Sequence, residues 1–204
     1  MLPAPIPADE KERLAALYRL NILDTPPEDR FDRITHLATR LFKAPIATLT
    51  LVDSNREWFK SCQGLDEKQN DRAISFCGHA VLSDNIFIIP DALKDPRFAD
   101  NPLVVGEPHI RFYAGIALFS ADNYRIGTFC IKDRKPRFLS EMEITDLKSL
   151  ASWAELEMNS RELQQAFKEK LVYMERLERL NKLMIGRELK MIQLKKEITS
   201  LKKK

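Results

Sequence analysis

The stretch ISFCGHAVL, at positions 74–82, places a thiol at Cys77 two positions before an imidazole at His79. A cysteine and a histidine can form a nucleophilic pair, or they can supply two of the four ligands of a zinc ion. Nucleophilic catalysis also needs a lowered thiol pKa and an oxyanion site, and a zinc site needs two more ligands. Because the other cysteines and histidines show no CxxC or HxxxH spacing, we expect no catalytic residues and no metal.

The local sequence indicates how Cys77 and His79 are held. Two residues apart on a helix, their side chains point in different directions, whereas on a strand they would share a face. The glycine between them and the flanking residues favour a short helix that starts at Ser75. We expect this helix to pack over a sheet, with Cys77 and Ala80 buried and His79 hydrogen-bonded.

Composition places the chain among ordinary intracellular proteins. Its 204 residues can form one domain with an extension. The three cysteines, Cys62, Cys77 and Cys130, are few and widely spaced, as is typical of reduced thiols in a cytosolic protein. No apolar run approaches the ~20 residues that span a bilayer, and the N-terminus lacks a signal peptide. We expect a soluble, cytoplasmic protein without membrane insertion.

Proline and glycine divide the chain. All 11 prolines lie at or before Pro136, and the residues beyond contain few helix breakers. Ser140 is a candidate N-cap, with Glu143 as its capping-box partner. We therefore predict a mixed domain over residues 1–158, closed by a helix that begins near Ser140, and a helical extension over residues 159–204.

The extension shows a heptad pattern, with apolar positions alternating by four and three residues, which is typical of a left-handed coiled coil. The predicted coiled-coil residues are Leu177, Leu180, Met184, Arg187, Met191, Leu194, Ile198 and Leu201. A narrow apolar stripe needs a partner helix, and a second copy of the chain, forming a parallel homodimer, is the simplest one. The alternatives are an antiparallel hairpin and packing on the globular domain. Lys170, Gly186 and Arg187 weaken the seam and could make it easy to shift.

Charge is distributed unevenly. Residues 161–204 contain 13 basic and 6 acidic residues, a net charge of +7, whereas residues 1–160 carry −4. A basic tail can bind nucleic acid or an acidic membrane surface. Because this tail also has regular apolar positions, we interpret its charge as the solvated face of a helix and expect no nucleic-acid partner.

Residues 1–136 combine helical and strand patterns. Thr25 and the two prolines after it predict the start of a helix that continues to Phe42 with apolar residues at helical spacing. Strand-rich stretches follow and form two hairpins and a single strand. They lie at 45–53, 56–64, 86–91, 112–121 and 125–133. Hairpins combined with flanking helices predict an α+β fold, with helices on a central antiparallel sheet.

The segment 65–111 between the hairpins is too long for a simple connection, and such segments are often functional. Its aromatic residues could line an apolar cavity, and Arg97 or Arg111 could bind an anionic ligand with two hydrogen bonds. Alternatively, Asp91, Arg97 and Asn101 fix turns, with Arg97 as an internal partner of Asp91. The candidate ligand-binding residues are Phe76, Cys77, His79, Asp91, Arg97, Phe98, Asn101, Arg111 and Tyr113.

Several motifs occur in an order that is similar to a known family. They are LDTPPE (23–28), APIATLTLVD (44–53), REWFKSCQGL (56–65), SFCGHAV (75–81), PDALKDPRFADNPLV (90–104), IRFYAG (110–115) and IGTFCIKD (126–133). Together they resemble the GAF domain of bacterial sensor histidine kinases and diguanylate cyclases. The resemblance implies dimer-forming helices on one face of the sheet and a ligand pocket on the other, with 65–111 as the pocket wall.

The tail NKLMIGRELKMIQLKKEI (181–198) resembles the signalling helix that links such sensors to an output domain. The sequence contains no kinase phosphoacceptor region and no GGDEF signature, so we expect an excised or stand-alone sensor. The resemblance implies a non-catalytic module of two-component or related signalling, which relays a small-ligand or interdomain signal to a histidine kinase or diguanylate cyclase, in cis or in trans.

Specialised members of the family carry further signatures. Free methionine sulfoxide reductases use paired cysteines, phytochrome-type proteins use a Cys-His dipeptide with an Asp-Ile-Pro strand, and cyclic-nucleotide-binding domains use an Asn-Lys…Phe…Asp-Glu pattern. The chain reproduces none of these, so the resemblance names no cofactor. Two alternatives stay open: a thiol-based redox enzyme or sensor that uses Cys77, and a dimerisation module without a ligand.

Overall fold

The computed structural model of the chain describes residues 1–201, with all of their side chains except those of residues 161, 162, 166, 188, 189, 193–197 and 199–201. The chain forms two compact units, Met1–Ser160 and Arg161–Lys204. The candidate site lies in the first unit, and the predicted coiled coil lies in the second.

The first unit is built on a six-stranded sheet in which all neighbouring strands are antiparallel. The strands are β1 (Ile46–Val52), β2 (Arg56–Gln63), β3 (Gln69–Asp71), β4 (Phe87–Ile89), β5 (Phe112–Phe119) and β6 (Arg125–Asp133). Their order is β3-β2-β1-β6-β5-β4. The predicted hairpins and the predicted single strand are confirmed as β1–β2, β5–β6 and β4. The short strand β3 was not predicted, because its sequence, QND, has no apolar residue.

Helices of very different lengths accompany the sheet. They are α1 (Glu10–Arg19), α2 (Asp29–Phe42), α3 (Phe76–Ala80), α4 (Pro102–Val105) and α5 (Glu141–Leu201), with 3₁₀ turns η1 (Arg72–Ile74) and η2 (Ala92–Lys94). Among the helices of residues 1–201, none is long and apolar enough to cross a membrane.

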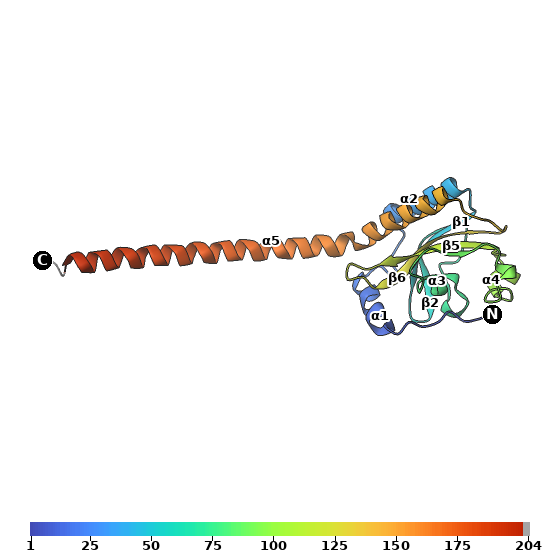
Figure 1. The fold of residues 1–204 in the computed structure, drawn as a ribbon, viewed down its shortest axis with the longest axis horizontal. Helices are drawn as coiled ribbons and strands as arrows, with labels where there is room; N and C mark the ends of the chain where they lie inside the picture. The colour runs from blue at the N-terminus through green and yellow to red at the C-terminus, as the bar shows by residue number, and fades with distance from the viewer. Residues whose placement is uncertain (202–204) are drawn as a thin grey trace. The chain divides into compact units, whose positions relative to one another are not determined.

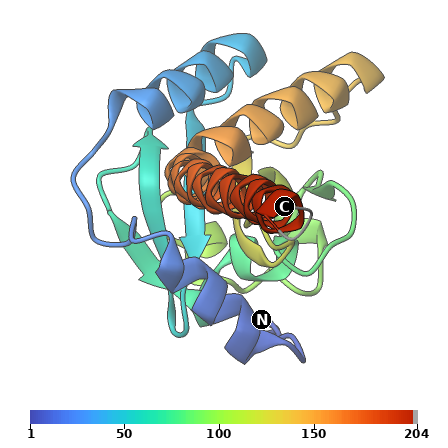
Figure 2. The same cartoon turned by 90° about the vertical axis from the view of Figure 1, so that its left-hand side faces the viewer.

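One face of the sheet is covered by α2 and the first part of α5, which lie side by side (Figures 1 and 2). The two helices run in opposite directions. Arg30, near the start of α2, donates to the backbone oxygen of Glu157 and to Ser160. At the other end, Arg137 donates to the backbone oxygen of Phe42 over 2.7 Å. Together with α1 and the sheet, these helices enclose the larger hydrophobic core.

The ends of these helices test two predictions. The capping box at the start of α5 is confirmed: the Glu143 carboxylate accepts from the Ser140 backbone nitrogen over 2.8 Å, and the Glu143 nitrogen donates to the Ser140 hydroxyl. The predicted start of α2 is wrong, because Thr25 instead donates to the oxygen of Ile22. The helix begins at Asp29, after an extended Glu28. Two prolines in succession keep the preceding backbone out of the helical region.

The opposite face of the sheet is covered by residues 65–111, which we call the cover segment. It contributes α3, α4, both 3₁₀ turns and the edge strands β3 and β4 (Figure 1). A second hydrophobic cluster fills the space beneath it and includes Phe76, Phe98 and Tyr113. The α+β fold, with a central antiparallel sheet flanked by helices and followed by a long C-terminal helix, is therefore confirmed.

The second unit consists of the C-terminal part of α5, in which many apolar side chains are solvent-exposed. Of the predicted coiled-coil residues, Leu177, Leu180, Met184, Met191 and Ile198 are each between 43% and 64% exposed. The side chains of Leu194 and Leu201 lie outside the described residues. A single copy leaves these apolar positions in water, so the coiled coil stays a prediction.

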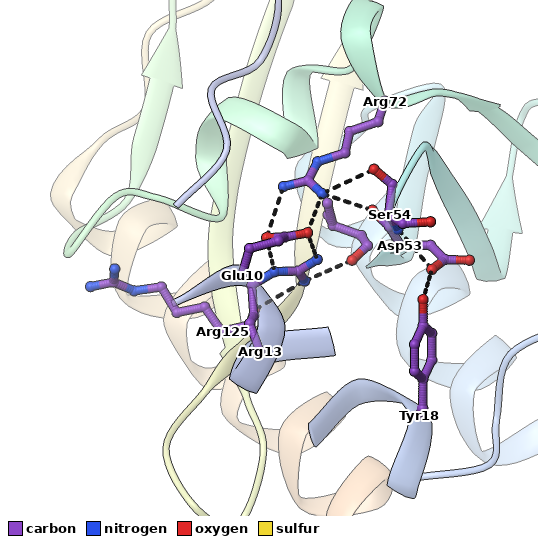
Figure 3. Close-up of polar contacts among 8 residues, drawn as sticks. Glu10, Arg13, Tyr18, Asp53, Ser54, Arg72 and Arg125 are labelled. Carbon is purple, nitrogen blue, oxygen red and sulfur yellow. Dashed lines mark hydrogen bonds and ion pairs between the residues drawn. The ribbon is translucent and has the colours of Figure 1, made fainter. Parts of the chain in front are cut away.

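A buried network of charges fixes α1 to the rest of the domain. The Glu10 carboxylate lies between the guanidinium groups of Arg13, at 2.7 Å, and Arg72, at 3.2 Å (Figure 3). Arg13 also donates to the backbone oxygen of Val52 over 2.7 Å, and Arg72 donates to that of Asp53 over 3.0 Å. The network therefore joins α1 to the sheet and to η1, the turn directly before α3.

Glu10 makes part of the stability depend on pH. Burial on its own raises the pKa of its carboxyl, but the hydrogen bonds and charges of Arg13 and Arg72 outweigh burial and lower the pKa to about 2. Because this value lies below the ~4.3 of an unfolded chain, the stabilisation is complete above that value and is lost as the pH falls through about 2.

We therefore expect the free energy of unfolding of the wild type to fall by roughly 2 kcal/mol more than that of Glu10→Gln when the pH is lowered from 5 to 2. This figure is below the full linkage value, because 18% of the Glu10 side chain is exposed and solvent screens it. Urea unfolding at several pH values measures the difference. Parallel pH profiles for the two proteins would contradict the assignment.

Candidate ligand-binding site

The face of the sheet beneath the cover segment is unusually polar for a protein interior. Alternate residues of a strand share a face, so β1 presents Thr48 and Thr50, and β6 presents Thr128, Cys130 and Lys132. All five are buried. The intervening residues of both strands are apolar and belong to the core on the helical face. Burial of this many polar groups is costly unless they bind one another or a ligand.

A buried carboxylate on β2 anchors the start of α3. The Glu57 side chain is fully buried and accepts hydrogen bonds from the Ser75 hydroxyl and from the Asn70 amide, the latter over 3.0 Å. The Ser75 hydroxyl oxygen in turn accepts from the backbone nitrogen of Gly78 over 2.9 Å. Ser75 is thus the N-cap of a short helix, as predicted, and Glu57 fixes the orientation of this N-cap.

Lys132 is the exceptional group on this face. It is only 1% exposed, and among the described residues its ammonium has no ion pair and no hydrogen bond. The nitrogen lies 5.2 Å from the centre of the Phe59 ring. Burial on its own lowers the pKa of Lys132, but Cys130, Cys77 and Glu57 outweigh burial and raise it. Although Glu57 and the cysteines favour the charged form, none of them forms a direct ion pair with Lys132 within the described residues, so its ammonium can still bind an anionic group on a ligand.

The cover segment closes the site with aromatic rings. Phe76 and Phe98 stack with their centres 4.3 Å apart, and Tyr113 of β5 stacks on Phe76 at 5.3 Å. His79 meets the edge of Phe98 at 4.9 Å, and its ring nitrogen lies 3.1 Å from the backbone oxygen of Leu2. The expected hydrogen bond of His79 is therefore present. Burial lowers the pKa of His79, which favours the neutral imidazole.

Cys77 lies between the aromatic residues of the cover segment and the polar face of the sheet. It is fully buried, as predicted, and its sulfur accepts from the Tyr113 hydroxyl over 3.4 Å. The phenol lies over Gly115, where a Cβ atom would be 2.3 Å from the hydroxyl oxygen. Gly115 therefore makes room for Tyr113. Burial and the neighbouring cysteine raise the pKa of the Cys77 thiol.

The two arginines considered for an anionic ligand each have an aspartate partner. Arg111 donates to both carboxylate oxygens of Asp91, over 2.8 and 3.0 Å. Arg97 donates to both oxygens of Asp95, over 2.9 and 2.6 Å. The hydrogen bond to Arg111 lowers the pKa of Asp91. The partner of Asp91 is therefore Arg111 and not Arg97.

Asn101 joins two parts of the cover segment. Its side-chain oxygen accepts from the nitrogen of Leu103 at the start of α4, and its amide donates to the oxygen of Ile74 over 2.8 Å. The structure thus gathers Phe76, Cys77 and Phe98 with Tyr113 in one cluster. The other candidates lie around this cluster or brace the cover, and ligand binding by the set stays a prediction.

Two open hollows lie elsewhere on the domain. One, of about 730 Å³, follows the outer face of α2 beside His36, and the other, of about 680 Å³, follows β2 beside Lys60. None of the nine candidate residues lines either hollow. Lys60 is paired with Glu28 over 2.7 Å, so it does not need a ligand. The unpaired charge of Lys132 makes the covered face the better candidate.

Sequence reasoning missed Glu57, Thr48 and Lys132. The signal was present: in the sequence GTFCIKD, polar residues alternate with Phe129 and Ile131 through an otherwise apolar strand. Such alternation usually marks a strand with one face in water. Here the cover segment buries that face, so only the tertiary structure distinguishes an interior site from an ordinary amphipathic strand.

Comparison with known proteins identifies the architecture. The GAF domain family model matches residues 26–158. A cyclic di-GMP phosphodiesterase of Pseudomonas aeruginosa is 41% identical over 152 residues, which are 74% of this chain. The match covers only 26% of that enzyme, so the chain spans about a quarter of the length of this relative.

Solved structures agree on the fold. The blue-light-absorbing form of the PixJ GAF domain of Thermosynechococcus elongatus has a TM-score of 0.56 at 14% identity, covering 83% of this chain and 98% of that one. The GAF domain of an Acinetobacter phosphoenolpyruvate-protein phosphotransferase has a TM-score of 0.54 at 16% identity, covering 76% and 98%. GAF domains are sensory modules, and this chain belongs to the GAF domain family.

Proposed function

We propose that this chain is a cytoplasmic, non-catalytic sensory module that binds a small anionic molecule between the sheet and the cover segment. The observation that carries the proposal is the buried Lys132 side chain, whose ammonium interacts with Glu57 and the cysteines through charge but forms no direct ion pair within the described residues. An anionic group on a ligand would neutralise this charge, and Phe76, Phe98 and Tyr113 would enclose the apolar part. Cys77 and His79 would border the ligand, while Asp91, Arg97, Asn101 and Arg111 hold the cover in place.

A path of direct contacts leads from this site to α5. Lys132 is followed in β6 by Asp133, whose carboxylate accepts from Arg137 over 3.2 Å, and Arg137 lies 3.9 Å from Glu143 in the first turn of α5. At the end of β5, the Phe119 nitrogen donates to Glu155 over 3.0 Å, and the Phe119 oxygen accepts from Asn159 over 2.9 Å. A ligand that displaces β5 or β6 would therefore move α5, which is the element that continues into the second unit.

The second unit would transmit this motion as a parallel homodimer. Its exposed leucine and methionine side chains at heptad spacing support a coiled coil with a second copy. Gly186 has no neighbouring atom within 4 Å of the position of a Cβ atom, so its effect is on helix propensity. With Arg187 beside it, this point of the seam would be the easiest to shift or rotate.

The proposed output activity is based on the resemblance of the chain to signalling proteins and on one similar protein. The histidine kinase and diguanylate cyclase classes were expected from the sequence, and the Pseudomonas relative is named for the breakdown of cyclic di-GMP. Since the match covers only 26% of that relative, we propose an output in cyclic di-GMP or histidine kinase signalling, acting in cis or in trans.

Substitution of Lys132 by methionine tests the proposal. Lys132→Met removes the ammonium but keeps an unbranched side chain of similar length, and because Glu57, Cys130 and Cys77 favour the charged form of Lys132, the variant is expected to lose some stability. In native mass spectrometry, we expect the wild type, purified from bacterial cells, to be a dimer with a non-covalently bound mass that Lys132→Met lacks.

The matched control is Lys94→Met, because the Lys94 side chain is 84% exposed and lies outside the covered face. It should keep the dimer and the bound mass. A wild-type dimer of bare protein mass would assign the lysine a structural role and leave a dimerisation module without a ligand. A monomeric wild type would refute the coiled coil.

A further inference from the structure

The fold brings together two cysteines that are distant in the sequence. Cys77 of α3 and Cys130 of β6 are 53 residues apart, yet their sulfur atoms lie 3.8 Å from each other. Both side chains are fully buried. A disulfide needs a sulfur–sulfur distance of about 2.05 Å, so a small movement of the short helix α3 towards the sheet would bring the two sulfurs into bonding distance.

The surroundings of the two thiols differ. The Cys130 sulfur lies 3.0 Å from the Thr48 hydroxyl, and the ammonium of Lys132 is on the same face of β6. Burial alone raises the pKa of Cys130, but Cys77, Lys132 and Thr48 outweigh burial and lower it. The pKa of Cys77 is raised. Cys130 is thus the better nucleophile, and Cys77 is the partner that keeps its proton.

We infer that Cys77 and Cys130 are a redox-active dithiol that a hydroperoxide converts into an intramolecular disulfide between α3 and β6. The Cys130 thiolate attacks the hydroperoxide, the O–O bond breaks, and a sulfenic acid forms while the alkoxide leaves and takes up a proton to become the alcohol. The Cys77 sulfur then attacks the sulfenic sulfur, and water leaves with the thiol proton. In total, two thiols and one hydroperoxide give one disulfide, one alcohol and one water.

The Cys77–Cys130 disulfide would also affect the contacts that connect the proposed ligand site to α5. The disulfide would attach the cover segment covalently to β6, two residues before Lys132 and three before Asp133. Access to the thiols requires the cover segment to open. The N-terminal residues also lie over α3, because the backbone nitrogens of Leu2 and Ala4 donate to the oxygens of Arg97 and Ala73. We therefore expect oxidation on the timescale of cover opening and reduction by a small dithiol on the same timescale.

The experiment counts thiols in the full chain. The protein is treated with hydrogen peroxide, denatured, alkylated with N-ethylmaleimide and mapped by peptide mass spectrometry. We expect one alkylated cysteine, Cys62, and one cross-linked peptide pair that contains Cys77 and Cys130. Dithiothreitol should restore three alkylated cysteines. A cross-link that involves Cys62, or three free thiols after prolonged peroxide treatment of the native protein, would overturn the inference.

Single variants separate a specific pair from general oxidation. Cys62→Ser should form the disulfide at the wild-type rate, and Cys130→Ser should lose the cross-link while Cys77 stays a thiol. In Cys77→Ser, Cys130 should accumulate as a sulfinic acid, since no partner thiol resolves the sulfenic acid. The bound mass is measured on the wild type and on Lys132→Met, neither of which alters a cysteine, so it is read separately from the disulfide. Failure of the disulfide therefore leaves the proposed function unaffected, and the reverse also holds.

Discussion

Phe98→Ala is expected to lower the free energy of unfolding by about 3–5 kcal/mol. Phe98 is fully buried and stacks on Phe76 with ring centres 4.3 Å apart. Its truncation removes this contact, together with the edge contact to His79, and leaves a cavity under the cover segment that neighbouring side chains can fill only in part. Chemical denaturation of the purified variant measures the loss.

The matched control is Leu93→Ala, in the same cover segment, where the side chain is 44% exposed and little change is expected. A second measurement distinguishes a cavity from general disorder. Benzene binds dry apolar cavities, so it should raise the melting temperature of Phe98→Ala and leave that of the wild type unchanged. A loss below about 1 kcal/mol would show that the cover segment is not packed as described.

Glu10→Gln is expected to cost about 3 kcal/mol, the lower end of the range for breaking a buried ion pair. The substitution leaves the guanidinium groups of Arg13 and Arg72, which are 1% and 4% exposed, without a neutralising charge. Both arginines keep backbone oxygens as acceptors, at Val52 and Asp53, which limits the loss. Urea unfolding at pH 7 measures the effect.

The control is Glu12→Gln, because Glu12 lies in the same first turn of α1 and is exposed. It should change stability by less than about 0.5 kcal/mol. The Glu10 network also borders η1, directly before α3, so Glu10→Gln should increase amide hydrogen exchange in the cover segment near Arg72 as well as in α1. Increased exchange in α1 alone would show that the network stabilises the helix without bracing the cover.

Most helices and strands were predictable because they depend on local sequence patterns. Alternating apolar residues around polar turns indicated the two hairpins, and the Ser140 and Glu143 pair indicated the start of α5. The start of α2 was misplaced at Thr25, since the same residue types can cap a helix or close a turn before one. That choice depends on which acceptor is within reach, and here the acceptor is the oxygen of Ile22.

The candidate site was predictable only in part. The aromatic residues of the cover segment were recognised as a group, because a long aromatic-rich connection between strands needs a surface to bury it. The alternative that paired Asp91 with Arg97, its near neighbour in the sequence, was wrong, because the partner of Asp91 is Arg111, 20 residues away. Pairing depends on the strand register, which places Arg111 directly before β5 and within reach of Asp91.

The sequence by itself determined that this chain is an α+β GAF domain with a long C-terminal helix, since those features follow from local periodicity, capping residues and an ordered set of motifs. Only the tertiary structure decided that Lys132 is buried without an ion pair and that Cys77 meets Cys130. The physical reason is that strand alternation assigns residues to a face, whereas burial of that face depends on a cover segment in which Cys77 is 53 residues from Cys130 in the sequence.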